Sequence, residues 1–275
     1  MIRDITIGQY YEKETCVHAL DPRMKIIATF VYIISMFCFH RLLGCAVSAI
    51  FLWTVIKISK VPLGYIVKGL KPIAMILLFT MCVQILFSNG TPIVKFGVIC
   101  ISWKGIHEAV FMGVRLCLLV FGASMLTFTT TPNQLTDGLE KVFHPLNRLH
   151  VPVHEIAMMM SIALRFIPIL LEETDKIMKA QMARGADFET GGLMKRAKSM
   201  LPLLVPLFVA AFRRANDLAL AMEARGYRGG EGRTKMKPLQ YKKIDFIAYS
   251  MLVLYLIVLF VATRYVPYLG AYVAS

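Results

Sequence analysis

Two arginines occur in the same short motif, and their side chains are well suited to bind a carboxylate. The two copies are Ala183-Arg184-Gly185 and Ala224-Arg225-Gly226. A guanidinium is planar, stays charged and holds a carboxylate with two parallel hydrogen bonds. An arginine followed by a glycine is also an ordinary helix end, because the cation complements the helix dipole and the glycine adopts a left-handed conformation. Two copies therefore indicate a pair of equivalent docking points for a two-fold partner.

Other residues with chemical potential lack the pattern that a site needs. His150 and His154 are four apart, but Pro152 breaks the helical register between them, so no metal site is predicted. The sequence has no GxxxxGK[ST] loop, so this chain is not expected to bind ATP itself. The six cysteines form no CxxC and are interpreted as small apolar residues. No catalytic residue and no cofactor is predicted.

The composition predicts an integral membrane protein. Hydrophobic residues make up 57% of the 275 residues, charged residues only 17%, and the mean hydropathy is +0.62. The net charge is nevertheless +14, and from Thr130 to Lys243 there are 18 Lys and Arg against 11 Asp and Glu. This basic segment is expected to face the cytoplasm, toward acidic lipid head groups or an acidic protein surface. Its apolar flanks argue against nucleic acid, and the polar N-terminus predicts no cleavable signal peptide.

Five apolar runs predict transmembrane helices at about 24–39, 43–58, 72–87, 105–128 and 244–266. Basic residues concentrate before the first run and between the second and third. The positive-inside rule therefore places the N-terminus in the cytoplasm and the C-terminus outside. Between the third and fourth runs, Asn89-Gly90 and an alternating apolar pattern predict a small hairpin.

The region between the fourth and fifth runs is predicted to form long amphipathic helices outside the lipid. Apolar residues recur at three- and four-residue spacing in 153–184 and 194–225, and Arg165 interrupts the first apolar stretch. A shorter helix, 132–149, starts from Thr131-Pro132. The prediction is an all-α integral membrane protein with a membrane domain at 1–131, cytoplasmic helices at 132–240 and a last transmembrane helix at 241–275.

Two functional classes receive less support from the sequence than a protein that docks a partner. An integral membrane enzyme would need clustered carboxylates or histidines, but the acidic group around Glu172 is matched by Lys176 and Lys179 and indicates a solvated face. A self-sufficient carrier would need its own substrate site, but the predicted spans hold few polar groups beyond Gln84 and Arg115. Arg115 is a functional hypothesis by default, and whether it faces the helix bundle or snorkels outward is left open.

Several motifs together resemble a known family. They are His18-x-Leu20-Asp21-Pro22-Arg23-x-Lys25, Pro145-Leu146, Ala163-Leu164-Arg165-Phe166-Ile167-Pro168, Ala180-Gln181-x-Ala183-Arg184-Gly185 and Glu223-Ala224-Arg225-Gly226-Tyr227. Across nearly its whole length the chain is similar to the transmembrane T component of energy-coupling-factor (ECF) transporters, a branch of ABC-type importers for vitamins and metal ions.

The resemblance implies an energy-coupling scaffold, not an enzyme. Arg184 and Arg225 would contact two ATP-binding cassette ATPase subunits, which bind the ATP, while Ala183 and Ala224 would allow close approach and Gly185 and Gly226 would end the helices. The same helices would carry a membrane-embedded, substrate-binding S component. Met158, Met159 and Met160 suit a surface that repacks against several S components, or are ordinary apolar filler. A dedicated cobalt or nickel permease is the alternative.

Overall fold

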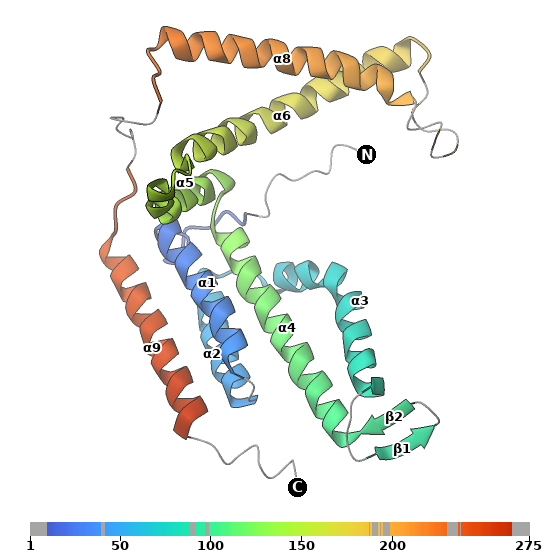
Figure 1. The fold of residues 1–275 in the computed structure, drawn as a ribbon, viewed down its shortest axis with the longest axis vertical. Helices are drawn as coiled ribbons and strands as arrows, with labels where there is room; N and C mark the ends of the chain where they lie inside the picture. Colours follow the sequence, from blue (N-terminus) through green and yellow to red (C-terminus); the bar gives the residue numbers. More distant parts are fainter. Residues whose placement is uncertain are drawn as a thin grey trace. The chain divides into compact units, whose positions relative to one another are not determined.

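A computed structural model describes residues 10–39, 42–87, 92–96, 99–186, 188, 192, 194, 199–229, 236 and 238–265 (Figure 1). The chain divides into two compact units. We call Leu139–Pro238 the arm unit. Residues 10–138 and 239–265 form the other, which we call the bundle unit.

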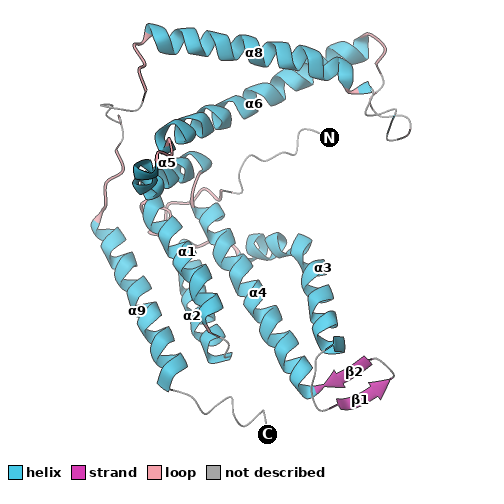
Figure 2. Cartoon of the chain, viewed as in Figure 1, coloured by secondary structure: helices cyan, strands magenta, loops and turns pink. Residues whose placement is uncertain are grey.

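The bundle unit is built from long helices and one small hairpin. Its elements are α1 (Pro22–Cys38), α2 (Leu42–Ser59), α3 (Leu63–Phe87), β1 (Pro92–Phe96), β2 (Ile99–Ser102), α4 (Trp103–Thr129), the first part of α5 (Pro132–Phe143) and α9 (Lys243–Tyr265). The two strands pair antiparallel, as magenta arrows show in Figure 2, which confirms a hairpin in this loop. The strands are joined between Phe96 and Ile99, so Asn89-Gly90, which precedes β1, is not the turn between them. Asn89 and Gly90 lie outside the described residues. The all-α class is confirmed, with this hairpin as an addition.

The core of the bundle unit lies where α1, α2, α4 and α9 meet. The rings of Phe51 and Tyr255 stack with centroids 4.4 Å apart. The Tyr255 hydroxyl also hydrogen-bonds the hydroxyls of Ser35 and Ser48, at 2.8 and 3.0 Å. Because α1, α2 and α9 each contribute one of these three groups, a buried polar contact fixes how the three helices pack.

Arg115 faces the interior of the bundle unit. Only 7% of the residue is exposed, and its guanidinium carbon lies 4.8 Å from the centroid of the Phe37 ring. A cation over an aromatic face gains electrostatic stabilisation, and more so where water is excluded. Of the two orientations considered from the sequence, the inward one is therefore correct.

Five helices are long and apolar enough to cross a bilayer: Leu42–Ser59, Gly69–Leu86, Trp103–Thr129, Val153–Ala183 and Lys243–Arg264. The protein is therefore a multi-pass membrane protein. The predicted number of spans agrees, but their identity differs at one place. Helix α1, with 17 residues, is not among the five, whereas Val153–Ala183 was predicted to stay outside the lipid. Length and composition alone select Val153–Ala183, and Arg165 near its middle still argues against a lipid-facing span.

The arm unit continues from α5 through a 3-10 helix, η1 (His144–Leu149), into α6 (Val153–Ala183) and α8 (Leu201–Ala224). Thr131 Oγ1 accepts from the Gln134 amide and Gln134 Oε1 accepts from the Thr131 amide, and this capping box lies at the helix start predicted from Thr131-Pro132. The predicted helix 132–149 is α-helical only to Phe143, because Pro145 lacks an amide hydrogen and restricts the residue before it. The predicted helix 153–184 is confirmed as α6; of the predicted helix 194–225, the part from Leu201 is confirmed as α8, which begins after a turn at Met200.

Candidate docking site

The first Ala-Arg-Gly element ends α6 with a Schellman motif. Arg184 is the C-cap, and Gly185 follows with a φ of 91°. The amide of Gly185 donates to Met182 O at 2.9 Å, and the amide of Ala186 donates to Gln181 O at 3.0 Å. These two bonds satisfy carbonyls that the helix end would otherwise leave unpaired.

The second element ends α8 in the same way. Arg225 is the C-cap, and Gly226 has a φ of 72°. The amide of Gly226 donates to Glu223 O at 2.8 Å, and the amide of Tyr227 donates to Met222 O at 3.0 Å. The repeat seen in the sequence is therefore a repeat of backbone geometry, with each arginine in the position directly before a left-handed glycine.

Both elements are open to a partner. All six residues are exposed: Ala183, Arg184, Gly185, Ala224, Arg225 and Gly226. Among the described residues, neither guanidinium lies within salt-bridge distance of a carboxylate. An exposed arginine on a fixed helix end, with only alanine and glycine beside it, can enter a groove without displacing other side chains.

The helices that carry these elements pack against one another and run in opposite directions, so their C-terminal ends lie at opposite ends of the pair (Figure 1). An ion pair joins them, with Arg214 Nη2 2.8 Å from Glu173 Oε2. Arg184 follows Glu173 by as many residues as Arg225 follows Arg214. At 1.5 Å per residue, the helix segment from the ion pair to each arginine is about 16 Å long, so the two arginines are equally distant from the ion pair.

The methionines singled out from the sequence lie near the start of α6. Met159 and Met160 are 58% and 43% exposed, and Met158 is half-buried. A second apolar surface on α8 was not predicted as exposed, and we call it the α8 stripe. Its members share one face at three- and four-residue spacing: Leu201, Leu204, Val205, Phe208, Val209 and Phe212. This spacing was the sequence signal that could have identified it.

His150 and His154, the two histidines weighed as metal ligands, take part in local structure. His154 Nδ1 lies 3.0 Å from Glu140 Oε1, while His150 sits after η1 with a φ of 60°. In the described part of the chain, no group of three or more His, Cys, Asp or Glu side chains could hold a metal ion.

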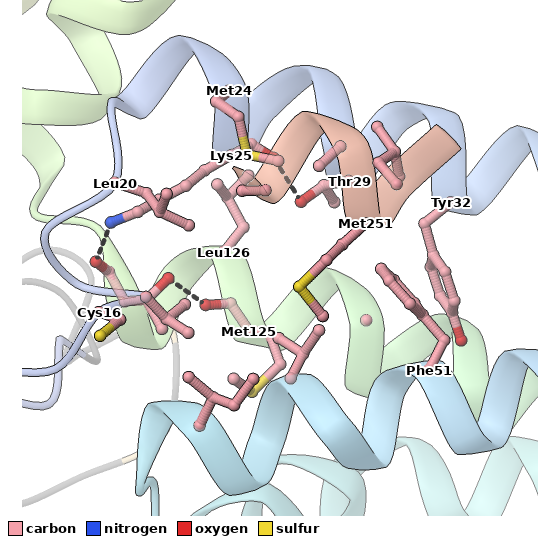
Figure 3. A pocket seen from close by; sticks show the side chains of 18 of the residues that line it. Cys16, Leu20, Met24, Lys25, Thr29, Tyr32, Phe51, Met125, Leu126 and Met251 are labelled. Atoms are coloured by element: carbon pink, nitrogen blue, oxygen red, sulfur yellow. Dashed lines mark hydrogen bonds between the residues drawn. The ribbon is translucent and has the colours of Figure 1, made fainter. Parts of the chain in front are cut away.

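The bundle unit contains a cavity of about 410 Å³ among α1, α2, α4 and α9. Its walls are mainly apolar, and Figure 3 shows the Lys25 ammonium at one end, hydrogen-bonded away from the cavity interior. Among the described residues of the lining, Lys25 alone carries a charge, so these walls offer little for recognising a polar substrate. The cavity therefore differs in chemistry from the exposed arginine elements of the arm unit.

Comparison with known proteins identifies close relatives. Residues 13–236 match the family described as cobalt transport protein. The chain is 50% identical to the energy-coupling factor transporter transmembrane protein EcfT of Ruminiclostridium cellulolyticum, over 93% of this chain and 96% of the relative. It is 49% identical to the protein of the same name from Clostridium kluyveri, over 96% and 98%. It is 47% identical to that of Bacillus subtilis, over 89% and 93%.

Proposed function

We propose that this chain, which belongs to the family of energy-coupling factor transporter transmembrane proteins, links ATP hydrolysis by two ATPase subunits to the movement of an S component. The relatives are named as components of a transporter, which supports a non-enzymatic role in which the partner subunits bind the ATP. The S component, not this chain, then selects the vitamin or other micronutrient. The relatives' shared name favours this role over a dedicated cobalt or nickel permease.

The observation that carries the proposal is the pair of matching helix ends. Two homologous ATPase subunits present two equivalent grooves, and a single chain can fill both only with two equivalent projections. The Schellman motifs at Arg184 and Arg225 supply such projections with the same backbone bonds. Each arginine can hold an acidic side chain of one ATPase subunit with two hydrogen bonds.

The crossing of α6 and α8 explains how two contacts could act together. Because the helix segments from the Glu173–Arg214 pair to the two arginines are equally long, a change in the separation of the two ATPase subunits changes the angle between the helices. Both arginines would need to lie on the cytoplasmic side of the membrane. The proposed topology therefore has a cytoplasmic N-terminus, α6 and α8 outside the lipid, and an extracellular C-terminus.

The α8 stripe and the Met158–Met160 segment are the surfaces we propose for the S component. Large apolar side chains in a continuous row are rarely left in water and usually mark a contact with another protein or with lipid. Phe208 and Phe212 lie in the C-terminal half of the stripe, with ring centroids 4.7 Å apart. Flexible thioethers at 159 and 160 would allow different S components to pack there.

Charge reversal tests the docking role. Arg184→Glu and Arg225→Glu should each reduce recovery of ATPase subunits with the tagged chain from native membranes, because the reversed charge meets an acidic partner. Loss of a desolvated ion pair costs about 2–5 kcal/mol, or roughly thirtyfold and more in affinity, whereas an exposed pair is worth under about 1 kcal/mol.

Matched controls lie close to each arginine. Lys179→Glu on α6 and Arg228→Glu after α8 make the same change of charge at exposed positions. They should leave ATPase recovery within about twofold of the native chain, in line with the small effect of surface charges. Normal recovery and normal uptake with both Arg184→Glu and Arg225→Glu would refute the docking role.

A further inference from the structure

The segment before and within the first turn of α1 holds an unusual concentration of buried polar groups. Asp21 and Lys25 are each 6% exposed, and Asp245 at the start of α9 is 1% exposed. Buried charges are costly unless they are fully hydrogen-bonded, so each of these groups needs specific partners. Those partners lie at the two places where the chain passes between the bundle unit and the arm unit. We call the end of α4 and the first part of α5, up to Gly138, the outgoing passage, and the segment from Leu239 to Asp245 the returning passage.

The returning passage is held from the start of α1 by two hydrogen bonds, and a third bond lies within the passage itself. Asp245 Oδ1 accepts from the Asp21 amide at 2.7 Å, and its Oδ2 accepts from the Lys242 amide at 2.6 Å. Arg23 Nη2 donates to Leu239 O at 3.0 Å. Leu239 is the first residue of the bundle unit after the arm unit ends at Pro238. The chain is thus fixed to α1 as soon as it re-enters the bundle unit.

The Arg23 guanidinium makes a second contact with the same passage. Its carbon lies 5.2 Å from the centroid of the Tyr241 ring, between Leu239 and Lys242 in the chain. A planar cation over an aromatic face is held in orientation as well as attracted. Arg23 therefore binds both the backbone and a side chain of the returning passage.

The outgoing passage is held by the next charged residue of α1. Lys25 Nζ donates to Thr129 O, the last residue of α4, at 2.8 Å, and to His18 O at 3.0 Å. The last carbonyls of a helix have no partner within the helix and carry its negative dipole end, so an ammonium is well suited to bind there. Lys25 thus fixes the point at which the chain leaves α4.

Close packing holds the outgoing passage a second time, at α5. A Cβ atom built on Gly138 would lie 2.9 Å from Pro22 Cβ and 2.8 Å from Ile26 Cδ1. Gly138 is the last residue of the bundle unit before the arm unit begins. Only a glycine allows α5 to approach the first turn of α1 this closely.

We infer that the Asp21-Pro22-Arg23-x-Lys25 segment is the mechanical joint of the protein, which fixes both passages to α1 so that a displacement of the arm unit is transmitted to the membrane helices. This inference rests on the proposed function, because that function supplies the displacement. Arg23, Lys25 and Gly138 are positioning residues, and none of them is proposed to contact the ATPase subunits.

Hydrogen exchange on the complete complex tests the joint. The tagged chain is isolated with its ATPase subunits, with and without a non-hydrolysable ATP analogue, and exchange is followed in 129–136 and 239–246. Lys25→Met removes the ammonium with little change in length, and Gly138→Ala adds one methyl group at the close contact. Gly64→Ala on α3, where a Cβ would meet nothing within 4 Å, is the matched control.

The expected result is normal ATPase recovery with exchange in 129–136 accelerated about tenfold in Lys25→Met and Gly138→Ala. In addition, the analogue should alter exchange in α1 of the native complex and the Gly64→Ala control but not in these two variants. A merely structural role would accelerate exchange and leave the response to the analogue intact, which would overturn the joint. Unchanged exchange would overturn it as well.

Two further comparisons keep the outcome interpretable. Arg23→Lys keeps the charge but loses the planar fork, so it provides a milder variant if Lys25→Met fails to assemble. It should accelerate exchange in 239–246 and weaken the response to the analogue, and an intact response would contradict the joint. If the native chain itself recovers no ATPase subunits, the proposed function fails; if it recovers them and all variants respond like the native complex, the joint alone fails.

Discussion

Replacing Gly226 with alanine separates the backbone role of this glycine from any effect of bulk. Gly226 has a φ of 72°, and a Cβ built there would meet nothing within 4 Å. The cost of the substitution is therefore the left-handed conformation alone, about 1–2 kcal/mol for a residue with a side chain. That free energy corresponds to roughly a 5–30-fold shift toward a frayed helix end. The same argument applies to Gly185, with a φ of 91°.

Amide exchange measures the fraying directly. The Tyr227 amide, which donates to Met222 O at 3.0 Å, should exchange about 5–30 times faster in Gly226→Ala. Gly226→Asn should have a smaller effect, because asparagine adopts the left-handed conformation more readily than alanine does. Recovery of the ATPase subunits should fall in the same order, since a frayed end no longer holds Arg225 in place. Exchange in Gly226→Ala equal to that of the native chain, or Gly226→Asn as disruptive as Gly226→Ala, would refute the reasoning.

Three further predictions concern other parts of the chain. Glu173→Arg should broaden the distance distribution between spin labels at 179 and 220, because the ion pair with Arg214 is worth up to about 1 kcal/mol. Glu173→Arg combined with Arg214→Glu should narrow the distribution again, and equal distributions in the single and the double variant would contradict a role of this pair in holding the two helices at their crossing. Burial, with the nearby positive charge of Lys25, lowers the pKa of His18 below its ordinary 6.5, so the unfolded segment binds more protons than the packed one. Packing of residues 10–20 should be complete above about pH 6.5 and weaken as the pH falls through that value toward the lower pKa of the folded state. The weakening should appear as faster amide exchange after correction for intrinsic rates. This effect of pH should be absent in His18→Gln. Phe208→Asp should reduce recovery of the S component and leave ATPase recovery unchanged; equal recovery of the S component would remove the α8 stripe from the proposal.

The helices and the two arginine elements could be predicted from the sequence because local rules determine them. The apolar spacing in 153–184 and the glycine after each arginine are enough to predict a helix and its end. The structure adds that both ends are Schellman motifs with the same bonds. Pro145 is likewise a sequence signal that the α-helix starting at Pro132 ends early, because a proline disfavours helical backbone in the residue before it.

Contacts between distant residues could not be predicted. The sequence suggested that Glu172 and its acidic neighbours pair with lysines of the same helix, whereas among the described residues the ion pair formed is Glu173 with Arg214 on α8. Likewise the motif from His18 to Lys25 was recognised only by resemblance. Its bonds to Thr129, Leu239 and Asp245 depend on the packing of three helix ends, which one sequence does not encode in any local pattern.

Photo-crosslinking from positions 183 and 224 in native membranes tests the central claim most directly. A photoreactive amino acid placed at Ala183 or at Ala224 lies beside an exposed arginine at the end of α6 or α8. Both positions should crosslink to ATPase subunits, and the chain carrying both should capture two of them. Crosslinking of either position to lipid alone, or its labelling by a reagent confined to the outside of the cell, would contradict the claim that both arginines dock on the ATPase pair.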